Sequence, residues 1–250
     1  MTSLSMIGGI VMALVQLLTI AQTSGAASIP ESCVNHYTDK LILAVGSDIT
    51  MGVTSGDMTH PYATFLETKL PQMAVRLIGS PLDRSRVTHD VLSEVYTGWP
   101  LFTTLPSVVV ILTGELDATE PHGIPVYPAE TLRMIESMHI MTHRFAQSKR
   151  IEIKTIAVTI PTEASNAKFV NHGLRKFAAN DHIKQHGRVY GIKEFTSVLD
   201  LSTDIEFAPL HGDENMMLTD DYEHLSIAGH DHLGALVLEE LCRLTSLTGS

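Results

Sequence analysis

Four polar residues in two short stretches have the types and spacing of a nucleophilic site. Ser47 and Asp48 follow the apolar run "LILAV" and Gly46, and Asp221 precedes His224 by three residues near the C-terminus. A serine hydroxyl attacks a carbonyl efficiently only when a base removes its proton, and a histidine oriented by a carboxylate is a common base. The two stretches therefore predict a nucleophile, a base and a group that orients the base.

Short apolar runs rich in β-branched residues alternate with segments of helical spacing along the chain. This alternation predicts βαβ units and a mostly parallel sheet. Sites in such sheets form beyond the carboxyl ends of the strands, where "GSDIT", "GSPLD" and "GELD" follow the first three runs. The five predicted strands are residues 40–46, 74–79, 107–114, 151–160 and 188–192.

Helical segments should carry their apolar residues on the face that packs against the sheet. In the segment after the fourth run, this face is predicted to contain Val170, Leu174, Phe177 and Ala178. The last helix is expected to begin near Ser226, which can cap it. Its buried face is then Leu233, Val237, Leu241 and Leu244.

Composition favours one exported globular domain. The chain has 250 residues, of which 44% are hydrophobic, enough for one sizeable core. Residues 1–27 carry no charged side chain and end in small residues, as in a secretory signal peptide. The mature domain is then residues 28–250, secreted or, as the alternative, held by an uncleaved membrane anchor. The net charge of −11 argues against nucleic acid as a partner.

The stretches "GSDIT", "GELD" and "DYEH" resemble three sequence blocks of the SGNH hydrolases, also called the GDSL esterase/lipase family. That family has G-D-S-[IL]-[TS] after the first strand, G-x-N-D after the third and D-x-x-H before the last helix. Here the blocks read "GSDIT", "GELD" and "DYEH", and the resemblance runs from Lys40 to the last helix. It implies an α/β, three-layer flavodoxin-like sandwich with a mostly parallel five-stranded sheet. It also implies a carboxylic-ester hydrolase that uses no metal and no cofactor.

The catalytic positions carry over only in part. In the family, the first-block serine attacks the ester, the last-block histidine is its base, and the aspartate three residues earlier orients the ring. His224 and Asp221 match these last two roles. Asp48, however, stands at the position of the nucleophile, and Ser47 stands where the family has aspartate.

The positions that bind the oxyanion have changed as well. The family also has a glycine block after the second strand, and Leu82 falls on its oxyanion-binding glycine. Gly114 matches the glycine of G-x-N-D, and Leu116 replaces the asparagine of that block. Leucine has no side-chain donor, and loss of one oxyanion donor typically lowers the rate about 100- to 1000-fold. Glu115 and Asp117, on either side of Leu116, are interpreted as solvated loop acids, with a cation-binding cluster as the alternative.

The resemblance also bears on the two cysteines. The first strand and last helix of this fold bring the chain ends together, so Cys33 and Cys242 are predicted to be neighbours. In an oxidising compartment they form either a bridge or two unrelated thiols.

Three functions remain open from the sequence. The first is an ester hydrolase with impaired or lost activity. The second is a non-catalytic secreted protein that binds a small molecule or a glycan or lipid ester in the retained cleft. The third is a hydrolase that uses Ser47 or Asp48 in a non-standard mechanism. The oligomeric state is not encoded in any readable pattern.

The pleat of the first strand predicts which of the two residues faces the base. A shift of one residue turns a side chain to the other side, so Asp48 is expected to point toward His224. Carboxylates from Asp48 and Asp221 on one imidazole would favour its protonated form. A protonated histidine cannot accept a proton as a general base, so the sequence predicts a poor or inactive esterase.

Overall fold

The computed structural model describes residues 28–54, 59–78, 88–98, 104–115, 117, 127–161, 170–189, 196–204, 206–207 and 224–246. Its elements in chain order are α2 (Glu31–Tyr37), β1 (Leu41–Gly46), α3 (Asp48–Met51), α4 (Tyr62–Lys69), β2 (Ala74–Ile78), α5 (Thr88–Gly98), β3 (Val108–Leu112), α7 (Pro128–Lys149), β4 (Lys154–Val158), α8 (Val170–Val189), β5 (Ser197–Leu199), the 3-10 turn η2 (Leu201–Thr203) and α9 (Ile227–Ser246). The predicted signal peptide, residues 1–27, lies outside the described residues.

The five strands form one parallel sheet in the order β2-β1-β3-β4-β5. This is the flavodoxin-like order, in which the chain reverses direction across the sheet beside β1. Every residue of β1 and of β3 is buried, because both faces of a parallel sheet are covered. The predicted α/β fold with a five-stranded parallel sheet is confirmed.

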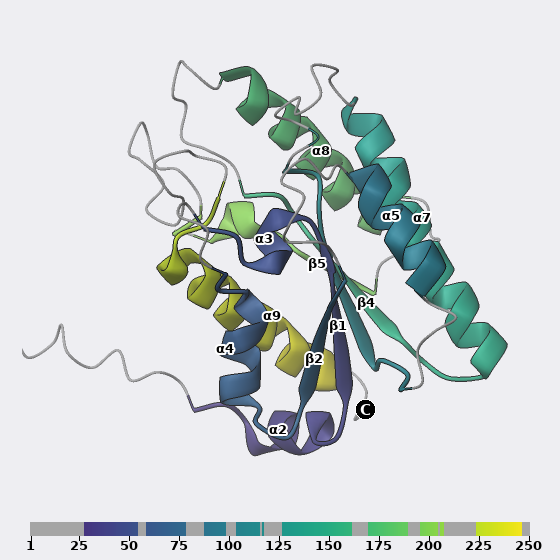
Figure 1. Cartoon of the computed structure of the whole chain (residues 1–250), viewed down its shortest axis with the longest axis vertical. Coiled ribbons are helices and arrows are strands. Elements are labelled where there is room, and N and C mark those ends of the chain that lie inside the picture. Colours follow the sequence, from purple (N-terminus) through teal and green to yellow (C-terminus); the bar gives the residue numbers. More distant parts are fainter. Residues whose placement is uncertain are drawn as a thin grey trace, which may run out of the picture.

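Helices cover both faces of the sheet (Figure 1). Ile42 and Ala44 of β1 belong to a core shared with α2, α4 and α9. Leu43 and Val45 belong to a second core, shared with α5, α7 and α8. Successive strand side chains point to opposite faces, so this three-layer arrangement requires the continuous apolar run that the sequence shows.

The last helix, α9, begins as predicted. The hydroxyl oxygen of Ser226 accepts a hydrogen bond from the backbone N–H of Gly229 at 3.0 Å, as expected of an N-terminal cap. The four residues predicted to form its inner face, Leu233, Val237, Leu241 and Leu244, are all buried.

The fifth strand was predicted in the wrong place. Residues 188–192 were expected to form it, but helix α8 continues to Val189 and the strand β5 is Ser197–Leu199. β5 has only three residues and pairs with β4 alone, at the edge of the sheet. A strand this short needs no long apolar run, so hydrophobic periodicity cannot distinguish it from a loop.

The inner face of α8 was also predicted wrongly. Leu174 is 61% exposed and Phe177 is 44% exposed, whereas among residues 174–185 the buried side chains are Lys176, Ala179, Asn180 and Ile183; the side chain of Val170 lies outside the described ones. Asn180 accepts a hydrogen bond from the N–H of Ile160 at 2.6 Å and donates one to its carbonyl at 2.7 Å. The inner face therefore contains polar residues, and an apolar pattern could not reveal it.

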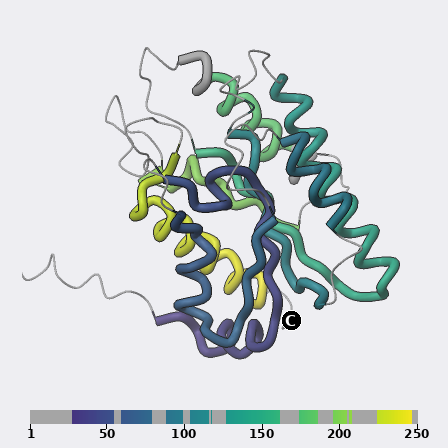
Figure 2. Tube along the Cα trace, viewed as in Figure 1, coloured from purple at the N-terminus to yellow at the C-terminus, as the bar shows by residue number. Residues whose placement is uncertain are grey.

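Helix α2 and the end of α9 lie at the end of the sheet where the strands begin (Figure 2). A disulfide joins Cys33 of α2 to Cys242 of α9, with 5.0 Å between their Cα atoms. Beside it, the Tyr37 hydroxyl donates a hydrogen bond to the Leu241 carbonyl at 3.1 Å. The expectation that the two cysteines are neighbours is confirmed, and they form the bridge.

Candidate active site

Ser47 lies in the turn between β1 and α3, and Asp48 is the first residue of α3, at the carboxyl edge of the sheet. Gly46 lets this turn approach β3, because a Cβ at position 46 would lie 1.9 Å from the Leu112 carbonyl oxygen. The Thr50 hydroxyl donates a hydrogen bond to the same carbonyl at 3.0 Å. These contacts hold the turn against the end of β3 and fix the directions of residues 47 and 48.

Asp48 faces His224. The Oδ2 atom of Asp48 lies 3.6 Å from Nε2 of His224, and the two side chains are 3% and 15% exposed. This separation is longer than a direct hydrogen bond. Both carboxylate oxygens of Asp48 are buried and accept no hydrogen bond from the described residues. The expected orientation of Asp48 is present, with a carboxylate where a serine hydroxyl would have to lie.

Ser47 has different partners. Its hydroxyl donates a hydrogen bond to Oε1 of Glu115 at 2.6 Å and lies 3.2 Å from the Thr113 hydroxyl oxygen. Ser47 is only 3% exposed. The hydroxyl hydrogen therefore points toward Glu115, beyond the end of β3, and not toward the imidazole of His224.

Glu115 is the residue whose role the sequence did not reveal. Its Oε1 atom also accepts a hydrogen bond from the backbone N–H of Ile49 at 3.3 Å. The pKa of Glu115 is raised to about 7: burial is the main cause and the nearby charge of Asp48 adds to it, while the hydrogen bonds from Ser47 and Ile49 lower it. A buried carboxyl group thus satisfies the first turn of α3 from another part of the chain.

Asp117 performs a similar task for α5 and α7. Its Oδ1 atom accepts a hydrogen bond from the backbone N–H of Thr88 at 2.8 Å, and its Oδ2 atom accepts one from the Thr131 hydroxyl at 2.5 Å. Glu115 and Asp117 are each 2% exposed, so their interpretation as solvated loop acids is wrong. Two acids placed immediately after a buried strand, where helices begin, were the available signal for this role.

The remaining predicted site residues divide into two groups. Gly114 has a φ of 113°, and a Cβ there would approach side-chain atoms of Ile160 and Thr131 at 2.8 and 2.9 Å. Its conformation therefore favours glycine. Asp221, Leu82 and Leu116 lie outside the described residues.

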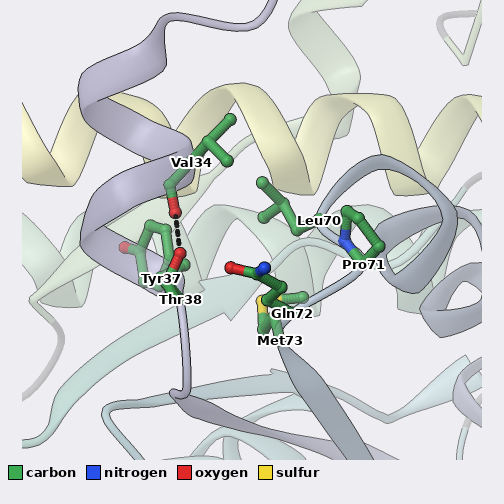
Figure 3. Close-up of a pocket in the computed structure, with 7 residues that line it drawn as sticks. All are labelled: Val34, Tyr37, Thr38, Leu70, Pro71, Gln72 and Met73. Atoms are coloured by element: carbon green, nitrogen blue, oxygen red, sulfur yellow. Dashed lines mark hydrogen bonds between the residues drawn. The ribbon is translucent and has the colours of Figure 1, made fainter.

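The described part of the chain has neither a metal site nor a membrane-spanning helix, but it has a small cavity. This part of the chain contains no group of three or more His, Cys, Asp or Glu side chains arranged to hold a metal ion. None of its helices is long and apolar enough to cross a membrane. A cavity of about 200 Å³ lies between the end of α2 and the turn before β2, away from Asp48 (Figure 3). It is lined by Val34, Tyr37, Thr38, Leu70, Pro71, Gln72 and Met73, with no carboxylate, imidazole or amine.

Comparison with solved structures identifies the fold. A GDSL-like lipase from Bacteroides thetaiotaomicron matches with a TM-score of 0.60 and 18% identity, over 90% of this chain and 96% of that chain. A lipase/acylhydrolase from Enterococcus faecalis matches with a TM-score of 0.57 and 19% identity, over 81% and 95% of the two chains. The chain has the fold of the SGNH hydrolases.

The SGNH fold extends to named carbohydrate esterases. A catalytic mutant of an acetylxylan esterase from Geobacillus stearothermophilus matches with a TM-score of 0.56 and 17% identity, over 82% of this chain and 94% of that chain. No family model and no curated protein matches the sequence. The matches to the solved structures confirm, at the level of the fold, the resemblance that the sequence blocks indicated.

Proposed function

We propose that this chain is a secreted protein of the SGNH fold that does not cleave carboxylic esters by the serine mechanism. In this proposal the site beside His224 binds a ligand without turning it over. The main support for this proposal is that Asp48 faces His224 while the Ser47 hydroxyl donates a hydrogen bond to Glu115.

Asp48 opposes ester hydrolysis in two ways. A carboxylate is a poor nucleophile toward an ester. If water or another nucleophile attacks instead, Asp48 keeps its negative charge and repels the oxyanion that the attack creates. Two unit charges about 4 Å apart interact by about 4 kcal/mol at an effective dielectric constant of about 20. Such a repulsion alone would slow the reaction roughly 1000-fold. The site is therefore better suited to binding than to acyl transfer.

The acceptors at the site favour a ligand rich in hydroxyl groups. Asp48 has two buried oxygens that accept no hydrogen bond from the described residues. Buried acceptors of this kind call for donors from water or a ligand, and sugar hydroxyls supply such donors. One structural neighbour is named an acetylxylan esterase, so we favour a glycan or glycan ester as the ligand class.

An ester assay tests the loss of activity. Purified native protein and the variants Ser47→Ala, Asp48→Asn and His224→Ala are compared on p-nitrophenyl acetate. All four are expected to hydrolyse it at the same slow rate. Rapid hydrolysis by the native protein that Ser47→Ala and His224→Ala abolish would contradict the proposal. Hydrolysis that survives Ser47→Ala but is lost in Asp48→Asn would instead assign the chemistry to Asp48.

Calorimetric titration with xylo-oligosaccharides and their acetylated forms tests the binding role. Asp48→Asn should weaken binding at least about 10-fold, because a hydrogen bond to a charged group contributes about 1.5–3 kcal/mol. Asp90→Asn, at a partly exposed position on α5, is the matched control and should bind as the native protein does. Equal affinity for native protein and Asp48→Asn would exclude this site.

The export part of the proposal has its own test. The chain recovered from the culture medium of its native host should begin after residue 26 or 27. An intact Met1 in a membrane fraction would favour the anchor instead.

A further inference from the structure

We infer that Glu115 is the positioning residue of this site, capping α3 from the segment after β3 so that residue 48 faces His224. Positions 47, 48 and 115 then form one unit, in which a change at one requires changes at the others. The inference rests on the proposed function, because it explains how the exchange of serine and aspartate is accommodated.

Helix α3 has no side-chain cap from the residue that precedes it. A residue that precedes a helix usually accepts a hydrogen bond from an N–H of the first turn. Ser47 precedes α3, but its side chain makes no such bond. The N–H of Ile49 is instead bonded to Oε1 of Glu115. The cap therefore comes from a residue 66 positions further along the chain.

Ser47 donates its hydrogen bond to Glu115 and does not accept one from α3. One oxygen of Glu115 accepts from both Ser47 and Ile49, at 2.6 and 3.3 Å. Ser47 thus acts as a donor to the cap, whereas the G-D-S motif places a carboxylate at this position. In this chain the carboxylate beside the first turn of α3 comes from Glu115, and position 47 supplies a hydroxyl donor to it instead of a carboxylate.

The contact between Ser47 and Glu115 limits which residues position 47 can hold. Ser47→Asp would introduce a second buried carboxylate where the Ser47 oxygen now lies, 2.6 Å from Glu115. Two carboxylates that share one site cannot both ionise, so one must be protonated or the turn must move. The exchange Ser47→Asp with Asp48→Ser therefore requires a third change, Glu115→Gln, whose amide can donate to the new carboxylate.

The experiment compares the double exchange Ser47→Asp/Asp48→Ser with the triple variant that adds Glu115→Gln. The control is Glu115→Gln alone, which shows what removal of this buried carboxyl group does when residues 47 and 48 are not exchanged. Thermal unfolding at pH 7 and the rate of labelling by a fluorophosphonate are measured for each. This probe modifies serines that a histidine base activates.

Adding Glu115→Gln to the double exchange should raise the melting temperature by several degrees more than Glu115→Gln alone raises that of the native protein. In the triple variant, the new serine at position 48 should be labelled at least 10-fold faster than in the double exchange, and His224→Ala should abolish that labelling. Equal melting temperatures and equal labelling in the double and triple variants would overturn the inference. An equal rise in melting temperature from Glu115→Gln in the native protein and in the double exchange would also overturn the inference, even if no variant is labelled. Labelling of the native protein at Ser47 is a separate result, and it would count against the proposed function instead.

Discussion

The substitution Glu115→Gln should change how stability depends on pH. Burial is the main cause that raises the pKa of Glu115 from 4.5 to about 7. The folded state therefore holds a proton that the unfolded chain has already released, and stability falls as pH rises from about 4.5 through about 7. A difference of about 2.5 pH units corresponds to roughly 3 kcal/mol. Glutamine keeps the acceptor oxygen for Ser47 and Ile49 but cannot ionise.

The difference in unfolding free energy between the Glu115→Gln variant and the native protein isolates this effect. Urea unfolding is measured at intervals from pH 4 to pH 8 with the disulfide intact. The variant should match the native protein near pH 4 and exceed its stability by roughly 3 kcal/mol at pH 8. Glu152→Gln, at an exposed position, should follow the native curve throughout. Parallel curves for native protein and Glu115→Gln would refute the assignment of a buried, neutral Glu115.

Three further substitutions test other parts of the structure. Burial lowers the pKa of His230 to about 4, so His230→Gln should remove a loss of roughly 3 kcal/mol that the native protein suffers as pH falls from about 6.5 to about 4. If the unfolding free energy of His230→Gln fell with pH as steeply as that of the native protein, the prediction would be wrong. The double change Cys33→Ser/Cys242→Ser should lower the free energy of unfolding by about 2–4 kcal/mol, and an unchanged urea midpoint would show that the bridge contributes nothing. Asn180→Leu should cost at least about 2 kcal/mol in the same assay, because it leaves both backbone groups of Ile160 without their partner; a cost below about 0.5 kcal/mol would rule out this role for the hydrogen bonds.

The predictable parts of the fold are those that packing alone determines. β1 and β3 are buried on both faces, so their apolar runs identify them, and Ser226 marks the start of α9. β5 is too short to produce a pattern. The inner face of α8 could not be read because Lys176 and Asn180 occupy it.

The site shows the same division. The facing of Asp48 and His224 follows from the pleat of β1 and the position of the last block, both of which are local. The role of Glu115 depends on contacts with Ser47, 68 residues away in sequence. Its carboxyl group accepts hydrogen bonds from Ser47 and from the N–H of Ile49, and no local sequence pattern relates these positions. Only the three-dimensional arrangement shows that they are in contact.

The state of the serine next to Asp48 is the most direct test of the central claim. The native protein is incubated with a fluorophosphonate at pH 7, and its intact mass and peptide masses are then measured. The mass should be unchanged, because the Ser47 hydroxyl is buried and bonded to Glu115 while Asp48 faces His224. A phosphonyl group on Ser47, absent after His224→Ala, would contradict the claim and make this chain a serine hydrolase.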